Sequence, residues 1–358
     1  MNLELFRLPV SPLPLWERSG RIADAIRVRG YGPSIDRNPS PQPSPTRGEG
    51  AHRRCRNSEP ILQPRWIGQL WLIFLVLVIS TATLSPARAQ DRINVVASFS
   101  ILGDFVRNVG GERVSVTTLV GPDGDVHVYT PAPADAKKIA GAKLLVINGF
   151  GLEGWLPRLL QASGSKASIV TATTGIAPLK LGSDADPHAW QSVANAKIYV
   201  ANIRDALVAV DPADAEVFRA NAESYLAKLD ALDREVRQAI AQIPQNRRKV
   251  ISTHDAFGYF AAGYGIDFIA PLGVSTESEV SARDIADIIT QVRKSGIPAV
   301  FLENISDDRL MRRISAETGA RVGGTLYSDA LTDEKGAAPT YIDMVRHNIK
   351  ALTSALAN

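Results

Sequence analysis

Cysteine is almost absent from this chain of 358 residues, and its single copy, Cys55, precedes the one long apolar run. The part of the chain after that run has no thiol, which excludes disulfide bonds, thiolate metal sites and a cysteine nucleophile there. No cysteine follows the run to carry a lipid either. We therefore expect the processed protein to be free in an exported compartment, most simply a periplasm.

An excess of positive charge is also missing from the part expected to fold. Although the net charge is +3, residues 1–89 carry 12 Lys or Arg and 6 Asp or Glu, whereas residues 90–358 carry 28 and 31. The basic isoelectric point therefore belongs to the N-terminal segment, and we expect no nucleic-acid partner. The composition, 45% hydrophobic and 22% charged, excludes a fibrous or wholly disordered protein.

Only one long apolar run is present, at residues 67–79, and its uninterrupted part is shorter than the ~20 residues of a transmembrane helix. Arg65 precedes it, and Ala87-Arg88-Ala89 offers small residues at the positions that a signal peptidase reads. We predict a signal peptide at 65–89, cleaved after Ala89. An uncleaved N-terminal anchor is the alternative, and finding Gln90 at the mature N-terminus would decide between them.

Residues 1–64 are rich in Arg, Pro and Ser and have no apolar periodicity, so they cannot form a core. We interpret them as a disordered extension or as sequence upstream of the true start. They do not enter the fold prediction.

Short β-branched runs alternate with helical patterns from residue 90 onward, which predicts parallel sheets covered by helices. The strands are continuous apolar runs, typical of strands buried on both faces. Because the pattern occurs twice, we predict an α/β fold with two lobes, at 90–210 and 244–358, each with a mostly parallel β-sheet flanked by helices.

One long helix is predicted to join the lobes, over residues 211–243. Asp211 and Pro212 form a typical helix start, and apolar residues then recur every three or four positions until Pro244. We interpret this helix as a rigid strut within one chain, and we expect a monomer. A coiled-coil dimer arm is the alternative for the same apolar stripe. The absence of a Gly/Ser hinge argues against large lobe closure.

Histidine is scarce, and three of the five copies stand in similar places. His127 and His254 follow predicted strands, and His188 lies in a turn after the last strand of the first lobe. Asp329 follows the last strand of the second lobe. Because ligands bind beyond the carboxyl ends of parallel strands, two facing lobes could bring these four side chains into one cleft.

Three imidazoles and one carboxylate suit a tetrahedral Zn²⁺ ion. The alternative is that each histidine is a separate structural residue, because the long spacings carry no local metal signature. His52 falls in the N-terminal segment, and His347 is interpreted as a structural surface residue of the C-terminal helix.

The chain from Ile93 onward resembles the metal-binding receptors of bacterial zinc and manganese ABC importers, whose two lobes are joined by one long helix. The resemblance rests on five ordered motifs, which are VVASFSILGDF, HVYTPAPAD, DPHAW, STHDAFGYF and LYSDAL. It implies no enzymatic activity, a periplasmic receptor that delivers Zn²⁺ to an inner-membrane ABC permease, and a periplasmic metallochaperone as a further candidate partner. The implied metal ligands are His127, His188, His254 and Asp329.

The third ligand position is the best sequence indication of which metal is bound. Family members with Glu there resemble manganese binders, whereas His254 resembles zinc binders, in line with the metal preference of imidazole. We predict Zn²⁺, with Mn²⁺ as the alternative. Glu303, Asp186 and Asp255 are candidate partners that orient a ligand histidine.

The sequence departs from the family pattern in two places, and two other functions are compatible with a metal site. The first ligand stands in Asp125-Val126-His127 where many relatives have Asp-Pro-His, and the long His-rich loop of some zinc receptors is missing. A zinc hydrolase would need an open metal position and a general base such as Glu303. An adhesin or interaction protein with a structural metal would unfold on chelation, whereas a transport receptor would stay folded.

Overall fold

The computed structural model describes residues 91–182, 184–277 and 280–357. The predicted signal peptide at 65–89 and the segment 1–64 lie outside these described residues. The described part belongs to one compact unit with two α/β lobes, so the predicted fold class is confirmed. Among the described helices, none is both long and apolar enough for a membrane span.

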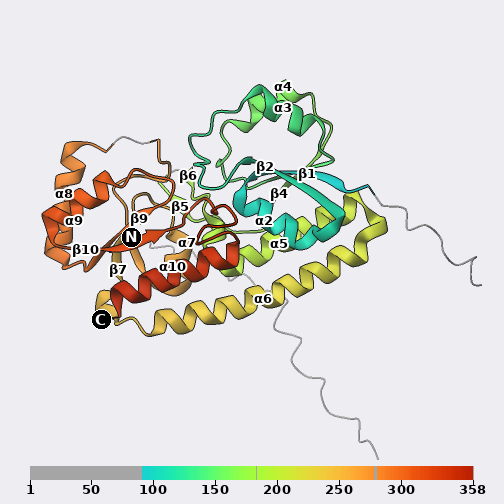
Figure 1. The fold of residues 1–358 in the computed structure, drawn as a ribbon. Helices are drawn as coiled ribbons and strands as arrows, with labels where there is room; N and C mark the ends of the chain where they lie inside the picture. Colours follow the sequence, from blue (N-terminus) through green and yellow to red (C-terminus); the bar gives the residue numbers. More distant parts are fainter. Residues whose placement is uncertain (1–90, 183, 278–279, 358) are drawn as a thin grey trace, which may run out of the picture. The chain divides into compact units, whose positions relative to one another are not determined.

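The first lobe contains a four-stranded, all-parallel sheet in the order β2-β1-β3-β4 (Figure 1). Successive residues of the two central strands point to opposite faces, and both faces are buried because helices α2 and α5 pack on one and α3 and α4 on the other. The strands are β1 (Ile93–Phe99), β2 (Val114–Val120), β3 (Leu144–Ile147) and β4 (Ser168–Thr171). The helices are α2 (Ser100–Gly110), η2 (Gly111–Arg113), α3 (Pro133–Ala140), α4 (Leu156–Ser163), η3 (Ala189–Gln191) and α5 (Val193–Val210).

The second lobe repeats this topology with the sheet β10-β9-β7-β8, again all parallel. Counted along the chain, the first sheet has the strand order 2-1-3-4 and the second 4-3-1-2, so in each the direction of winding changes between the first and third strands. Such a switch point opens a crevice at the carboxyl ends of the strands. The strands are β7 (Lys249–Ile251), β8 (Asp267–Ile269), β9 (Ala299–Glu303) and β10 (Arg321–Leu326). The helices are η5 (Gln245–Arg247), α7 (Gly258–Tyr264), α8 (Ala282–Ser295), α9 (Arg309–Thr318) and α10 (Tyr341–Leu356).

The long helix between the lobes is α6 (Ala215–Ala241), whose 27 residues span about 40 Å. It is preceded by a separate 3₁₀ turn, η4 (Pro212–Asp214), and the Asp211 side chain caps that turn by accepting a hydrogen bond from the backbone N–H of Ala213. Helix α6 packs against α2 and α5 of the first lobe and against α7 and α10 of the second (Figure 1). Its apolar stripe is buried against other helices of the same chain, so this stripe is not available to pair with a second chain in a coiled coil.

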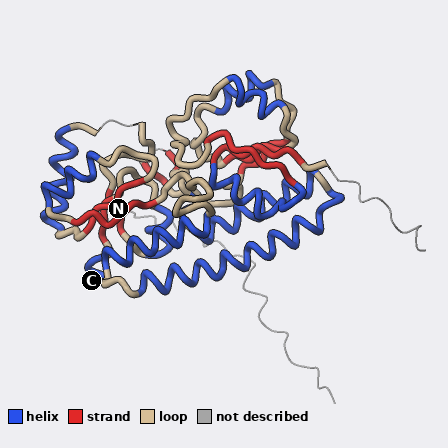
Figure 2. Tube along the Cα trace, viewed as in Figure 1, coloured by secondary structure: helices blue, strands red, loops and turns tan. Residues whose placement is uncertain are grey.

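One hydrophobic cluster runs through both lobes and α6, and two smaller clusters lie in one lobe each. Loops gather between the two sheets (Figure 2). A short antiparallel hairpin, β5 (Lys180–Leu181) with β6 (Asp184–Ala185), leads into this region. Loops of the two lobes contact one another directly there, for example where Thr276 donates a hydrogen bond to Asp125.

Candidate metal centre

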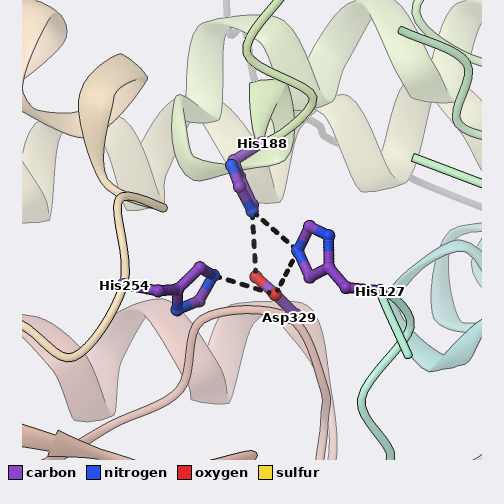
Figure 3. Close-up of side chains that lie close together, drawn as sticks. All are labelled: His127, His188, His254 and Asp329. Atoms are coloured by element: carbon purple, nitrogen blue, oxygen red, sulfur yellow. Dashed lines mark hydrogen bonds and ion pairs between the residues drawn. The ribbon is translucent and has the colours of Figure 1, made fainter. Parts of the chain in front are cut away.

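Four side chains converge between the lobes, and they are His127, His188, His254 and Asp329 (Figure 3). One nitrogen or oxygen atom from each lies within 4.8 Å of the others. Nε2 of His127 is 3.2 Å from Nε2 of His188 and 3.1 Å from Oδ2 of Asp329. Nε2 of His254 is 3.1 Å from the same Oδ2, and Nε2 of His188 is 3.7 Å from Oδ1. The structure thus brings together all four residues selected from the sequence.

Each of these four side chains belongs to a loop that follows a strand. His254 follows β7 and Glu303 ends β9, so both stand at the switch point of the second sheet. His127 follows β2, and Asp329 follows β10. The parallel topology therefore explains how His127, His254 and Asp329 reach one place. His188 comes instead from the segment after the antiparallel hairpin of β5 and β6.

The site is enclosed, because three of the four side chains are fully buried and that of His127 is only 6% exposed. Burial alone would raise the pKa of Asp329, yet the charges of His254 and His188 and the hydrogen bond with His127 hold that pKa well below 3.8. Burial alone would lower the pKa of His254, yet the charges of Glu303 and Asp329 hold it well above 6.5. The surroundings therefore favour positive charge at the centre of the site.

Asp186 orients His188. Its Oδ1 atom accepts hydrogen bonds from the backbone N–H of His188 at 2.9 Å and from the ring Nδ1 at 2.8 Å. Tyr259 donates its hydroxyl hydrogen to the Asp186 carbonyl, and a Cβ atom at Gly258 would lie 2.7 Å from Asp186 Oδ2. With Nδ1 engaged in this way, Nε2 of His188 presents its lone pair to the site.

Glu303 orients His254 in the same manner. Its Oε2 atom lies 2.6 Å from Nδ1 of His254, and its Oε1 atom accepts the backbone N–H groups of Thr253 and His254. The prediction that Glu303 partners a histidine of the site is therefore confirmed in geometry. Both of its oxygen atoms already accept hydrogen bonds, three in all, which suits a structural role better than that of a general base on a nearby water.

Asp125 fixes the loop of His127. Its Oδ1 atom accepts the backbone N–H of His127 at 2.9 Å, and its Oδ2 atom accepts the hydroxyl of Thr276 from the second lobe. Trp155 donates its indole N–H to the carbonyl of Val126. The Asp-Val-His variant of the motif therefore still uses its aspartate to bind the backbone of the histidine.

Asp255 and His347 lie outside this arrangement. Asp255 donates its backbone N–H to the carbonyl of Gly273, and burial raises the pKa of its carboxyl group. His347 is half-buried rather than at the surface, with Nε2 3.0 Å from the Thr325 carbonyl and its ring against Tyr327. Of the three carboxylates considered as partners, Asp186 and Glu303 contact a histidine of the site.

Chemically, the centre offers three imidazole nitrogens and one carboxylate with no thiolate. Bonds of about 2.0–2.1 Å in a tetrahedron place the ligand atoms about 3.3–3.4 Å apart. Three of the separations given above, 3.1, 3.1 and 3.2 Å, are close to that value, and all four ligand atoms lie within 4.8 Å of one another. The residues present therefore fit a four-coordinate divalent cation.

Comparison with known proteins gives the family. Residues 95–355 match the family described as zinc-uptake complex component A, periplasmic. The chain belongs to this family. The match spans both lobes and α6, and it confirms the resemblance deduced from the five motifs.

Two relatives are similar to this chain over most of their length. The iron-binding protein YfeA of Yersinia pestis is 35% identical over 283 residues, which cover 77% of this chain and 91% of that protein. The manganese-binding lipoprotein MntA of Halalkalibacterium halodurans is 36% identical over 268 residues, covering 75% and 89%.

Solved structures give the same result for the fold. The periplasmic zinc-binding protein TroA of Treponema pallidum aligns with a TM-score of 0.72 at 30% identity, covering 75% of this chain and all of that one. The Mn-bound periplasmic metal-binding protein from Candidatus Liberibacter asiaticus gives 0.67 at 32% identity, covering 74% and 98%. The names of these family members mention different metals, so the names alone do not assign one to this chain.

Proposed function

We propose that this protein is a periplasmic receptor that captures Zn²⁺ between its lobes and delivers it to an inner-membrane ABC permease. Zn²⁺ is its cargo and the four ligands are His127, His188, His254 and Asp329. The observation that carries the proposal is the convergence of three Nε2 atoms on one buried carboxylate. A periplasmic metallochaperone is proposed as a further partner that loads the site.

The choice of Zn²⁺ rests on the chemistry of the donors. Three imidazoles with a single carboxylate suit Zn²⁺, whereas Mn²⁺ prefers more oxygen ligands. The ligand spacing and the burial of the site also suit closed four-coordination, which is typical of zinc. The solved structure of TroA, a zinc-binding protein by its title, has the same fold.

A Mn²⁺ receptor of the same type is the second candidate. It is favoured by the manganese-binding name of MntA and by the Mn-bound structure from Candidatus Liberibacter asiaticus, both similar to this chain over most of their length. The two candidates share one site and differ only in which cation is bound more tightly.

A receptor accounts for the site better than a hydrolase. Four protein ligands leave no open position on a tetrahedral ion, and Glu303 already accepts three hydrogen bonds. The family is also one of receptors for transporters. Delivery from a periplasm requires export, so we propose that the signal peptide at 65–89 is cleaved after Ala89 and that the receptor acts as a monomer.

Metal binding by the purified protein tests the proposal. We expect one Zn²⁺ per chain and at least a tenfold loss of affinity on changing any of the four ligands to alanine. His347→Ala is the matched control, because this histidine lies outside the cluster and contacts the Thr325 carbonyl. The Zn²⁺ affinity of this variant should equal that of the wild type. Displacement of Zn²⁺ by an equal concentration of Mn²⁺ would reverse the metal assignment. Absence of any bound divalent cation would refute the function.

A further inference from the structure

Asp329 is held differently from the three histidines around it. Each histidine is bound, through its backbone or its ring, by a neighbouring carboxylate. These carboxylates are Asp125 for His127, Asp186 for His188 and Glu303 for His254. Among the described hydrogen bonds and ion pairs, the Asp329 carboxylate meets only the three imidazoles. Its position must therefore be set through the backbone of its loop.

On the N-terminal side of Asp329, that loop is bound by the first lobe. The Ser328 carbonyl accepts the indole N–H of Trp190 at 2.8 Å and the side-chain amide of Gln191 at 2.6 Å. Both donors belong to η3, the turn that begins directly after His188. Trp190, Gln191 and Ser328 are all buried.

On the C-terminal side, the first lobe binds the loop again. The backbone N–H of Leu331 donates to Oγ of Ser100 at 2.9 Å, and its carbonyl accepts the backbone N–H of Asp123 at 2.8 Å. The second lobe contributes a longer bond within this segment, from Asn304 to the Ala330 carbonyl at 3.4 Å. Farther from Asp329, Asn348 of α10 exchanges two hydrogen bonds with the backbone of Tyr327. Although Asp329 follows a strand of the second lobe, the carbonyl group directly before it is therefore bound by the first lobe.

We propose that Gln191 is a positioning residue of the metal site, which sets the place of Asp329 relative to His188 through the Ser328 carbonyl. Gln191 lies in the short turn η3 that follows His188, and Ser328 directly precedes Asp329. Loss of the amide donor leaves the Ser328 carbonyl with the Trp190 N–H as its remaining donor, so the carbonyl can shift and displace the carboxylate of Asp329. This inference rests on the proposed function, since it assigns a role in metal binding.

Gln191 can be tested without removing the core residue beside it. Trp190 packs on His188 and on Phe99 with ring centroids 5.3 and 5.0 Å apart, so its replacement would open the core. Gln191→Met keeps the length of the side chain and removes the donor. The Ser328 carbonyl retains the Trp190 N–H in this variant, and we therefore expect the fold to persist. Gln191→Glu is the second variant, because it places an oxygen atom against the carbonyl oxygen.

The control is Asn202→Leu in α5. The Asn202 side-chain amide also donates to backbone carbonyls, those of Ala172 and Thr174, but these belong to the segment after β4. We expect both Gln191 variants to release Zn²⁺ to a chelator about tenfold faster than the wild type, which is the lower end of the effect of residues that support a ligand. The visible spectrum of bound Co²⁺, which reports ligand geometry, should also change. Asn202→Leu should alter neither, even if it lowers the stability of the metal-free protein.

Release rates within twofold of the wild type, with an unchanged Co²⁺ spectrum, would overturn the role of Gln191 and leave the proposed function intact. If the wild-type protein bound neither ion, the proposed function would fail first. Hydrogen exchange of residues 326–333 in the metal-free protein would then decide the inference separately. Faster exchange in Gln191→Met than in the wild type supports the link to Ser328, and equal exchange contradicts it.

Discussion

Glu303 shows how one buried side chain controls the form of a neighbouring histidine. As a carboxylate it accepts a hydrogen bond from the Nδ1–H group of His254, which leaves Nε2 free to bind a cation. Glu303→Gln places an amide N–H₂ group there, so that Nδ1 becomes the acceptor and the ring proton moves to Nε2. We expect Zn²⁺ affinity to fall about 10- to 100-fold, as measured by competition with a chromophoric chelator.

The control for this change is Glu112→Gln, which alters an exposed glutamate paired with Arg92. Its affinity for Zn²⁺ should match that of the wild type. Equal affinities for all three proteins would show that Glu303 does not set the proton position of His254. A similar loss in both variants would point to a general effect of charge instead.

At the residue scale, the sequence identified those groups whose chemistry and position in a motif were both distinctive. The three histidines, Asp329 and Glu303 stood at strand ends or in the turns after them, and general rules for parallel sheets place such residues together. Gln191 could not be found in this way, because its partner Ser328 lies 137 positions away and neither residue belongs to a periodic pattern. Contacts of this kind depend on how the lobes meet.

Among the elements, α2 and the start of α10 meet at a buried carboxylate. Oδ2 of Asp104 accepts hydrogen bonds from the Tyr341 backbone N–H at 3.1 Å and from the Tyr225 hydroxyl at 3.3 Å. Burial raises its pKa above 3.8, and the bond from Tyr341 and the charge of Arg107 offset this only in part. The folded protein therefore resists ionisation of Asp104 more than the unfolded chain does.

The sign of the resulting pH dependence follows from this shift. The contribution of Asp104 to stability is complete below the pKa of the unfolded chain and is lost as pH rises through the higher pKa of the folded protein. Asp104→Asn cannot ionise, so its stability relative to the wild type should increase with pH, by about 1.4 kcal/mol for each unit of raised pKa. Urea unfolding of the metal-free proteins between pH 3.5 and 7.5 measures the difference.

A control of opposite sign is available at Asp307. Hydrogen bonds from Arg309 lower the pKa of this exposed carboxyl group, so its contribution is present at neutral pH and is lost on acidification. The stability of Asp307→Asn relative to the wild type should therefore fall as pH rises. A difference for Asp104→Asn that stays constant or falls over the same range would contradict the assignment.

The secondary-structure elements were predictable where one pattern dominated. Strands such as β3 were predicted as continuous apolar runs, and α6 as a long amphipathic helix. The start of α6 was less accurate, because Asp211 and Pro212 are equally compatible with a 3₁₀ turn, and η4 is what forms. Whether such a start becomes α or 3₁₀ depends on packing against neighbours, which sequence periodicity does not contain.

For the whole molecule, the central question is whether the fold depends on the ion. The hydrophobic clusters of both lobes contain none of the four proposed ligands, and the largest of them runs from the first sheet through α6 into the second lobe. A protein with this core is expected to fold without a metal, unlike one in which the metal replaces a core. The alternative of an interaction protein with a structural metal makes the opposite prediction.

Removing the metal distinguishes these two alternatives. After chelation and removal of the chelator, we expect an unchanged far-ultraviolet circular dichroism spectrum and one cooperative thermal transition. Free Zn²⁺ at 100 times its Kd should then stabilise the protein by about 2.7 kcal/mol, raising the Tm by roughly 5–10 °C. The Asp329→Ala protein, treated in the same way, should show the same spectrum but little Zn²⁺-dependent rise. Unfolding of the wild type on chelation would mean that the ion holds the lobes together, and the receptor function would lose its basis.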